Sequence, residues 1–246
     1  MKTLVVIPSR YGSTRFPGKA LADIHGQPLV VRVMERASRI KNADHIVVAT
    51  DDQRIFDAVS KSGFNCEMTA EHPTGTDRIG EVAARHEAEI ILNLQGDEPL
   101  LDPQIADDLI RVMLEDSAID MATCAHPFVE EGQWLDPNTV KVLIDQMKNA
   151  LYFSRAAIPG SFPGKKSKDL GGMNAALRHV GLYAFRRKAL EKFLQLAPTP
   201  LEKAEGLEQL RALENGMRIH VLEIDQAPIG VDTPADLQQV RKMWRS

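Results

Sequence analysis

Short apolar runs alternate with amphipathic stretches along the first half of this chain. The predicted strands are continuous runs, most of them rich in β-branched residues, at 4–7, 45–50, 64–68, 89–94 and 120–125. Between them, apolar residues recur at helical spacing, most clearly after Pro28 and from Pro103 to about residue 114. Strands that alternate with helices predict crossover units, and hence an α/β fold with a mostly parallel sheet.

The second half of the chain has a less regular pattern. Its predicted elements are strands at 140–144, 178–185 and 218–224 and helices at 188–196 and 200–213. The segment 159–174 is rich in Pro, Gly and Lys, which favours a loop. No shift in composition separates two independent domains. We therefore expect a single domain over residues 1–246, with an irregular region at about 126–185.

Composition and charge exclude several classes of protein. The chain has 246 residues, of which 43% are hydrophobic and 26% charged, and its formal net charge is -4. A general nucleic-acid or anionic-membrane binder carries a basic face, so this balance argues against both. No apolar run is long enough to span a bilayer or to form a signal-peptide core. Cys66 and Cys124 are far apart and predict free thiols in a reducing compartment, so we expect a cytoplasmic protein.

The segment 7–19, directly after the first predicted strand, carries the most distinctive chemistry. It concentrates Arg10, Arg15 and Lys19 among Gly, Pro, Ser and Thr residues, with no acidic residue to neutralise them. Backbone N–H groups, hydroxyls and three cations suit a polyanion such as a nucleoside triphosphate. Taken alone, the segment fits an ordinary solvated surface loop equally well.

This segment is not a Walker A loop, so any metal ligands must come from other parts of the chain. Five residues separate Gly12 from Gly18, where a Walker A loop has four, and Ala20 follows Lys19 where a hydroxyl would hold magnesium. A dinucleotide-binding glycine pattern is also missing. If the segment binds phosphate, carboxylates from other parts of the chain must hold the metal.

Asp97 and Asp232 are the two carboxylates best placed for that task. Asp97 follows an interior strand, and parallel sheets collect their ligands at the carboxyl ends of their strands. Asp232 precedes the last predicted helix, in which Thr233 can be the N-cap, Pro234 the first helical residue and Asp236 the acidic residue of the capping box. That helix therefore needs no side chain from Asp232, although a turn or helix-dipole role is the simpler alternative.

Together these pieces predict a reaction class. Mg²⁺ prefers a few carboxylate oxygens and keeps waters and substrate phosphates as its other ligands. A cationic loop beside such carboxylates suits nucleotidyl transfer, in which a substrate oxygen attacks the α-phosphate in line. Arg15 and Lys19 would then stabilise the pyrophosphate leaving group.

Seven segments in order along the chain resemble the 3-deoxy-manno-octulosonate (Kdo) cytidylyltransferase, or CMP-Kdo synthetase, family. They are IPSRYGSTRFPGK (7–19), TGTDR (74–78), NLQGDEP (93–99), YFSRAAIP (152–159), RHVGLY (178–183), LEQLR (207–211) and GVDTP (230–234). The resemblance implies a Mg²⁺-dependent enzyme that makes CMP-Kdo and pyrophosphate from CTP and Kdo for bacterial lipopolysaccharide. It also implies a Rossmann-like nucleotidyltransferase sheet and a homodimer formed through the less regular second half.

The same resemblance implies roles for individual residues. Four residues of the first segment would meet the phosphates of CTP: Arg10, Ser13, Arg15 and Lys19. The nucleotide would lie near Thr74, Asp77, Arg78 and Gln95, and Mg²⁺ would be held by Asp97 and Asp232. The sugar acid would contact Gln95, Arg155, His179, Tyr183, Glu208 and Gln209. As alternatives, His179 and Tyr183 fit packed core groups, and Glu208 and Gln209 fit an exposed helix face.

Three alternatives to activation of Kdo itself remain open at this stage. The first is the analogue of Kdo with an amine in place of the 8-hydroxyl, and the segment 159–174 would influence that choice if it folds over the sugar. The second is another sugar acid such as a sialic acid, which Tyr11, Thr14 and Arg15 disfavour. The third is a nucleotide-binding module without turnover, which has no need of paired metal carboxylates.

Overall fold

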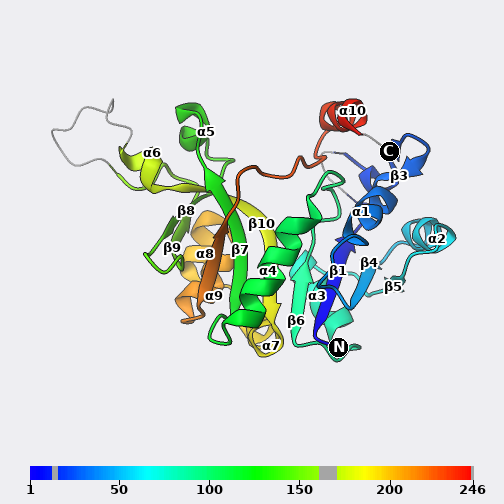
Figure 1. Cartoon of the computed structure of the whole chain (residues 1–246), viewed down its shortest axis with the longest axis horizontal. Helices are drawn as coiled ribbons and strands as arrows, with labels where there is room; N and C mark the ends of the chain where they lie inside the picture. Colours follow the sequence, from blue (N-terminus) through cyan, green and yellow to red (C-terminus); the bar gives the residue numbers. More distant parts are fainter. Residues whose placement is uncertain (13–15, 161–170, 245–246) are drawn as a thin grey trace. The chain divides into compact units, whose positions relative to one another are not determined.

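The apolar runs of the sequence form the strands of the computed structural model, which describes residues 1–12, 16–160 and 171–244 (Figure 1). The chain divides into two compact units. Unit 1 comprises residues 1–111 and 228–246, and unit 2 comprises residues 112–227.

Unit 1 is built on a parallel sheet with the strand order β6-β1-β4-β5. The strands are β1 (Thr3–Ser9), β4 (His45–Thr50), β5 (Cys66–Met68) and β6 (Ile90–Asn93), and every pairing among them is parallel. The side chains of residues 4–7 in β1 are fully buried. The helices α1 (Leu29–Ala37), α2 (Gln53–Lys61) and α3 (Gly75–Ala83) complete the crossovers between these strands. The predicted α/β fold with a mostly parallel sheet is confirmed.

β1 extends beyond the predicted strand at 4–7, because it continues through Pro8 to Ser9. Pairing between β1 and β6 stops at Val6, so Pro8 has a sheet neighbour only in β4. A residue paired on one side alone tolerates the missing N–H. The strand therefore carries Pro8 and Ser9 to the carboxyl edge of the sheet.

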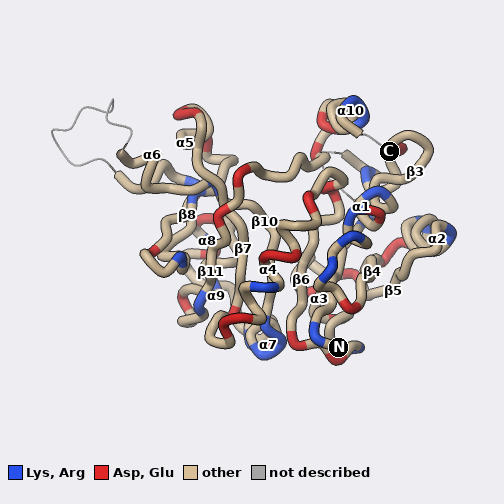
Figure 2. The backbone as a smooth tube through the Cα atoms, in the orientation of Figure 1, with Lys and Arg blue, Asp and Glu red and all other residues tan. Residues whose placement is uncertain are grey.

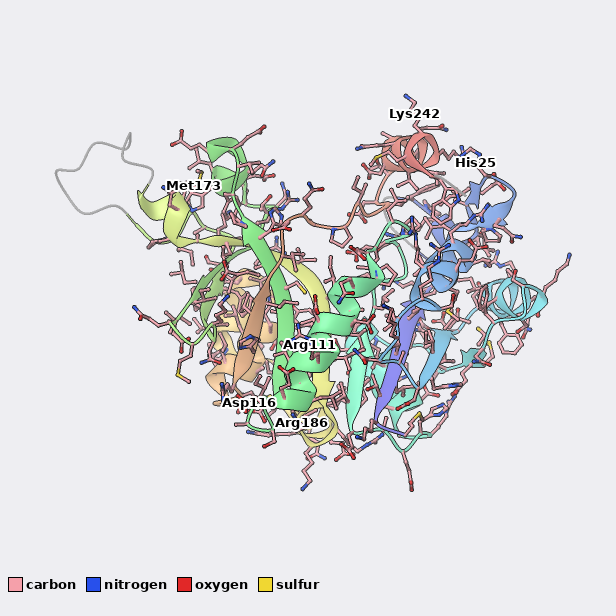
Figure 3. All side chains as sticks on the ribbon, in the orientation of Figure 1. His25, Arg111, Asp116, Met173, Arg186 and Lys242 are labelled. Carbon is pink, nitrogen blue, oxygen red and sulfur yellow. The ribbon has the colours of Figure 1, made fainter. Side chains whose placement is uncertain are left out.

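A small hairpin in unit 1 had no counterpart in the prediction. Its strands are β2 (Asp23–Ile24) and β3 (Gln27–Pro28), and its turn residues His25 and Gly26 have φ angles of 48° and 84°. His25 lies beside α10 (Pro234–Met243), with its Nε2 atom 2.8 Å from the carbonyl oxygen of Arg241 (Figure 3). The last helix is thereby attached to the hairpin.

Two helix starts in unit 1 are capped by local side chains. At α10, Thr233 accepts a hydrogen bond from the N–H of Asp236, whose carboxylate accepts from the N–H of Thr233 at 2.8 Å. This confirms the predicted capping box. At α3, Thr74 is the N-cap and accepts from the N–H of Asp77 at 3.1 Å.

Unit 2 is centred on β7 (Met121–Pro127). It pairs in parallel with β11 (Ile219–Glu223) and antiparallel with β10 (Leu177–Arg186), which also pairs with β8 (Lys141–Ile144). β8 in turn pairs with β9 (Ala150–Ser154), so antiparallel pairs predominate in this unit. Arg186 donates to the carbonyl oxygens of Met113 and Asp116, at the end of α4 (Pro103–Glu115) (Figure 3).

One predicted helix of unit 2 is divided in the structure. Where one helix was expected over 200–213, the chain forms α8 (Pro200–Glu205) and α9 (Gln209–Glu214), separated by Gly206 with a φ angle of 64°. A left-handed residue ends a helix, and glycine adopts that conformation at little cost. The expected helix over 188–196 forms as α7 (Arg187–Gln195).

The irregular region also contains two short helices, α5 (Glu131–Leu135) and α6 (Gly171–Ala175). Met173 of α6, labelled in Figure 3, packs with Phe128 and Ala176 in a small core, against which Trp134 and Leu143 also pack. The expected loop at 159–174 therefore ends in helical structure, and its residues 161–170 lie outside the described part of the chain.

Acidic and basic residues are interspersed along the backbone of both units, as expected from the nearly balanced composition (Figure 2). Among the described residues, no helix is long and apolar enough to cross a membrane. Cys66 and Cys124 are both free cysteines, as predicted.

Candidate active site

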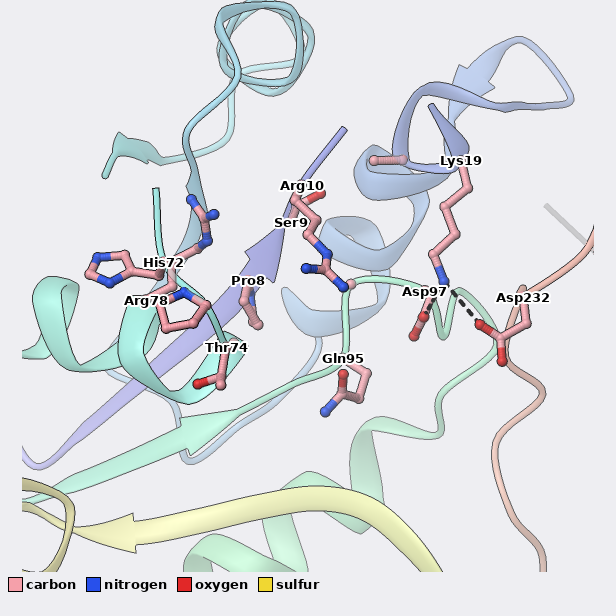
Figure 4. Close-up of a pocket in the computed structure, with 14 residues that line it drawn as sticks. Pro8, Ser9, Arg10, Lys19, His72, Thr74, Arg78, Gln95, Asp97 and Asp232 are labelled. Carbon is pink, nitrogen blue, oxygen red and sulfur yellow. Dashed lines mark hydrogen bonds and ion pairs between the residues drawn. The ribbon is translucent and has the colours of Figure 1, made fainter. Parts of the chain in front are cut away.

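A cavity of about 360 Å³ lies in unit 1, beyond the carboxyl ends of β1 and β6 (Figure 4). Its size falls within the usual range for small-molecule sites, and its place is where parallel sheets bind ligands. It is lined by Pro8, Ser9, Arg10, Lys19, Ala20, His72, Pro73, Thr74, Gly75, Arg78, Gln95, Gly96, Asp97 and Asp232. The cavity thus brings together residues from the first, second, third and last of the seven sequence segments.

Lys19 joins the two predicted metal carboxylates. Its Nζ atom lies 2.6 Å from Oδ2 of Asp97 and 3.2 Å from Oδ1 of Asp232, and it also donates to the carbonyl oxygen of Val231 at 3.1 Å (Figure 4). The Lys19 side chain is 17% exposed, against 29% for Asp97 and 49% for Asp232. A backbone hydrogen bond from Val231 to Asp97 ties the same two segments together.

The loop before Lys19 is closed by a backbone hydrogen bond from Gly18 to the carbonyl oxygen of Tyr11 at 2.9 Å. Gly18 has a φ angle of 72°, and a Cβ atom there would approach the Tyr11 ring to 3.1 Å, so both backbone and space require glycine. The Arg54 guanidinium carbon also lies over the Tyr11 ring, 3.4 Å from its centroid. Ser13 and Arg15 lie outside the described residues.

Gly96 sets how closely the loop after β6 approaches the end of β1. A Cβ atom at this position would come within 2.7 Å of the carbonyl oxygen of Pro8, which no ordinary side chain tolerates. Its absence lets Gln95 and Asp97 line the same cavity as Arg10. Sequence reasoning missed Gly96, although a glycine between two predicted site residues was a usable signal.

Thr74, Asp77 and Arg78 fix the beginning of α3 at the cavity. Thr74 donates its hydroxyl to the Asp77 carboxylate at 2.8 Å, in addition to capping the helix. Arg78 is only 3% exposed and binds Asp51 and Thr69 at 2.6 and 2.5 Å. Thr74 and Arg78 line the cavity, whereas Asp77 is not among the lining residues. The N-terminus of a helix attracts anions, so its position here suits a phosphate group.

Glu98, which was not among the predicted site residues, is a carboxyl group in an unusual environment. Its Oε2 atom is shielded from solvent and has no hydrogen-bond partner among the described residues. Burial, and then the negative charge of Asp97, raise the pKa of Glu98 to about 8. Glu98 is therefore mainly protonated at neutral pH, which leaves Asp97 and Asp232 as the anionic pair.

The donor set of this pair fits Mg²⁺. Two carboxylates on separate segments already accommodate a cation between them, since the Lys19 ammonium contacts both. Carboxylate oxygens are the ligands that Mg²⁺ prefers, and a partly exposed site leaves room for waters and substrate phosphates.

In unit 2, Arg155 is fixed by its surroundings. Its backbone N–H donates to the Glu205 carboxylate and its Nε to the Glu205 carbonyl oxygen, both at 2.8 Å. The fully buried Lys141 donates to the carbonyl oxygens of Asp136, Thr139 and Arg155 at 2.7, 2.7 and 2.8 Å. Burial lowers the pKa of Lys141, and the negative charges of Asp136 and Glu205 oppose that effect only in part.

Two other predicted sugar-binding residues of unit 2, His179 and Tyr183, lie close together. His179 stacks edge-on against Phe153 and lies 5.5 Å from Tyr183, centroid to centroid. Its Nε2 atom is 2.9 Å from the hydroxyl of Thr123, which faces two backbone carbonyl oxygens as well. Thr123 therefore links the His179 ring to the backbone of β10.

The pKa values in this group are shifted by burial. Burial lowers the pKa of His179 to about 3, so the ring is neutral at pH 7. Burial, and then the charge of Glu208, raise the pKa of Tyr183. Gln209 is only 5% exposed, so the alternative of an exposed helix face is wrong for that residue. Gln95 belongs instead to the cavity of unit 1.

Known proteins are similar in sequence to this chain over nearly its whole length. The cytidylyltransferase family model matches residues 4–219. A 3-deoxy-manno-octulosonate cytidylyltransferase of Geobacter metallireducens is 50% identical, and the match covers 98% of this chain and 96% of that protein. The enzyme of the same name from Pelobacter propionicus is 48% identical, with coverage of 100% and 98%.

Solved structures are also similar to this chain. A CMP:2-keto-3-deoxy-manno-octonic acid synthetase complexed with CTP superposes with a TM-score of 0.92 at 42% identity, covering 99% of this chain and 98% of that one. A cytidylyltransferase from Leptospira borgpetersenii has a TM-score of 0.66 at 19% identity, over 100% and 89% of the two chains. The second likeness concerns the fold alone.

Proposed function

This chain belongs to the 3-deoxy-manno-octulosonate cytidylyltransferase family, and from that premise we propose that it transfers the cytidylyl group of CTP to Kdo. The products are CMP-Kdo and pyrophosphate, and the activated sugar would serve lipopolysaccharide synthesis. We propose that the whole chain, 1–246, works as one nucleotidyltransferase domain.

The observation that carries this proposal is the contact of Lys19 with both Asp97 and Asp232 at the edge of the cavity. A binding module for nucleotides needs cations, but it does not need a pair of carboxylates that compete for them. A nucleotidyltransferase needs both, because it must bind a triphosphate and neutralise charge that moves during the reaction. Arg10 and the beginning of α3 supply further positive potential on the same cavity.

In the proposed reaction, a hydroxyl oxygen of the sugar acid attacks the α-phosphorus of CTP in line. The bond from that phosphorus to the bridging oxygen breaks, pyrophosphate leaves with the bonding electrons, and the hydroxyl proton passes to solvent. Arg10 and Lys19 would bind the phosphates and stabilise the leaving group. Ser13 and Arg15, by their positions in the first segment, would share that task.

We propose Mg²⁺ as the metal that Asp97 and Asp232 hold. When bound, it would supply positive charge beside the triphosphate. The Lys19 ammonium shares both carboxylates in the present arrangement, so we expect it to turn toward the phosphates when the ion enters. Thr74, Asp77, Arg78 and Gln95 would surround the nucleotide, with Asp77 acting through the Thr74 cap.

For the sugar acid we propose contacts with Gln95, Arg155, His179, Tyr183, Glu208 and Gln209. A carboxylate needs a cation, and several hydroxyls need hydrogen-bonding side chains. Arg155 would supply the cation. His179 is neutral, so one of its two ring nitrogens can accept a hydrogen bond from a sugar hydroxyl.

The test is release of pyrophosphate from CTP and Mg²⁺ with three acceptors: Kdo, its 8-amino analogue and N-acetylneuraminate. We expect release with Kdo, and none from an Asp97→Asn control. Preference for the 8-amino compound would change the acceptor but not the reaction. If no acceptor supports release, the chain is the non-catalytic nucleotide-binding module of the third alternative.

We propose that the chain forms a homodimer through unit 2. Apolar side chains there are unusually exposed: Val129 at 77%, Met147 at 68% and Leu151 at 60%. Leu151→Glu should shift sedimentation from dimer to monomer, whereas Met243→Glu in unit 1 should not.

We also propose that the protein works in the cytoplasm, which supplies CTP and keeps Cys66 and Cys124 reduced.

A further inference from the structure

Three side chains that the proposed reaction does not use converge beside the edge strand of unit 1. They are His45, Glu67 and His86, and one potential ligand atom from each lies within 4.8 Å of the other two. Nε2 of His86 is 2.5 Å from Oε1 of Glu67, and the two imidazole rings are 5.1 Å apart at an angle of 31°. Two imidazoles and one carboxylate form a donor set that Zn²⁺ and similar divalent ions favour.

The backbone explains why these residues meet. Glu67 in β5 is opposite Ala49 in β4, and His45 lies four positions before Ala49. Side chains alternate across a strand, so His45 and Glu67 project from the same face of the sheet. His86 follows the end of α3 and reaches that face from the helix side. The three ligands therefore come from three different elements of one sheet-and-helix framework.

Glu67 is held in place by a second partner. Arg85 Nη1 donates to its other carboxylate oxygen at 3.1 Å and to the carbonyl oxygen of Met68 at 2.9 Å. Arg85 also pairs with Glu81. Metal ligands in proteins are commonly oriented by such outer hydrogen bonds, and Arg85 leaves Oε1 of Glu67 directed at His86.

Burial is intermediate at this cluster, which suits an ion that enters from solvent. The side chains of Glu67 and His86 are 24% and 20% exposed. Tetrahedral coordination by Zn²⁺ would bring neighbouring ligand atoms to about 3.3 Å, so small side-chain rotations would close the site, with water as the fourth ligand. Cys66 directly precedes Glu67, so its side chain projects from the opposite face of the sheet. Burial raises the pKa of its thiol to about 12.

We propose that His45, Glu67 and His86 form a binding site for a divalent transition metal of the Zn²⁺ class. The bound ion ties the edge strand β5 to the start of β4 and to the end of α3, and it thereby stabilises unit 1. This site is separate in donor chemistry from the Asp97–Asp232 pair, whose oxygen ligands favour Mg²⁺. It does not depend on the transfer reaction.

The test is titration of the full-length, chelator-treated protein with Zn²⁺ by calorimetry, in millimolar Mg²⁺ to occupy oxygen sites. We expect one saturable equivalent and a rise in melting temperature. His45→Asn and His86→Asn should each weaken binding at least about 100-fold, beyond the roughly 10–100-fold that loss of an outer partner costs. His25→Asn, at an exposed turn where asparagine suits the positive φ, and Cys66→Ser are matched controls that should bind normally.

Circular dichroism of each variant shows whether it is folded. If a histidine change prevents folding, Glu67→Gln is a third variant that removes a proposed ligand. The proposal is overturned if the protein shows no saturable Zn²⁺ binding, or if the His45 and His86 variants bind as tightly as the parent. It is also overturned if Asp97→Asn abolishes binding while His86→Asn retains it, because the ion would then occupy the candidate active site. Tetrahedral Co²⁺ absorption that disappears in His86→Asn supports it.

Discussion

Replacement of Lys19 by methionine is the sharpest perturbation of the candidate active site. Methionine keeps most of the side-chain length but removes the ammonium that contacts Asp97, Asp232 and the carbonyl oxygen of Val231. The change therefore has two separable consequences. It removes a tie between three segments of unit 1, and it removes a positive charge from the place where pyrophosphate would leave.

The loss of stability should be modest. Both carboxylates are partly exposed, and ion pairs of that kind contribute about 0–1 kcal/mol each. A charge-assisted hydrogen bond to Val231 adds roughly 1 kcal/mol after allowance for solvent. The free energy of unfolding should thus fall by about 1–3 kcal/mol, which lowers the melting temperature of a chain of this length by roughly 2–12 °C.

The loss of turnover should be larger. A preorganised group that stabilises charge developing in the transition state is typically worth about 10²–10³ in kcat, or roughly 2.7–4 kcal/mol. Pyrophosphate release and thermal melting, measured on the same preparations, compare the two effects. Lys19→Arg should retain part of the activity, and Lys61→Met on the exposed face of α2 should change neither quantity.

Magnesium provides an independent readout of the same change. Without the ammonium, Asp97 and Asp232 repel each other, so Mg²⁺ should raise the melting temperature of Lys19→Met more than that of the parent. Turnover within tenfold of the parent would refute the catalytic role of Lys19. An equal response of both proteins to Mg²⁺ would show that Lys19 does not share the metal carboxylates in solution.

Three further predictions follow from the site. Asp97→Asn and Asp232→Asn should each lose most pyrophosphate release with a normal circular dichroism spectrum; near-normal rates would exclude that residue as a required ligand. Gly96→Ala should reduce CTP turnover at least tenfold in kinetic assays, because its Cβ would meet the Pro8 carbonyl oxygen at 2.7 Å, and unchanged kinetics would contradict the close approach. The pKa of His179 is about 3 in the folded chain and near 6.5 when unfolded, so its contribution to stability is complete above pH 6.5 and is lost as pH falls toward 3. Urea titrations between pH 7 and 5 should therefore show a smaller decline for His179→Gln than for the parent, by at most about 1.4 kcal/mol per pH unit, and parallel declines would exclude a buried neutral ring.

Much of the local structure could be predicted because its causes are local. The buried strands at 4–7 and 45–50 follow from continuous β-branched runs, and the Thr233–Asp236 capping box follows from side chains three residues apart. The prediction was wrong where a single residue changes a pattern, as at Gly206, which divides the expected helix.

The candidate site was only partly predictable, because some of its features depend on contacts between distant parts of the chain. The cationic loop and the two aspartates could be identified by their places at the ends of elements. Glu98 could not, because its importance depends on burial of its carboxyl group. Gly96 offered a signal in the sequence, but its reason appears only in the fold, where a Cβ atom would come within 2.7 Å of the Pro8 carbonyl oxygen. The cluster of His45, Glu67 and His86 was missed too, since no metal-binding spacing joins these positions in sequence.

Most strands and helices, the capping box of α10 and the kinds of charge at the strand ends could be predicted from the sequence alone, because hydrogen bonding and hydrophobic periodicity operate between near neighbours. The tertiary structure decided which of those charges meet. Lys19 contacts carboxylates 78 and 213 residues further along, a juxtaposition created only when β1, β6 and the segment before α10 pack together. That packing converts a cationic loop into one side of a site that can hold both a triphosphate and a metal ion.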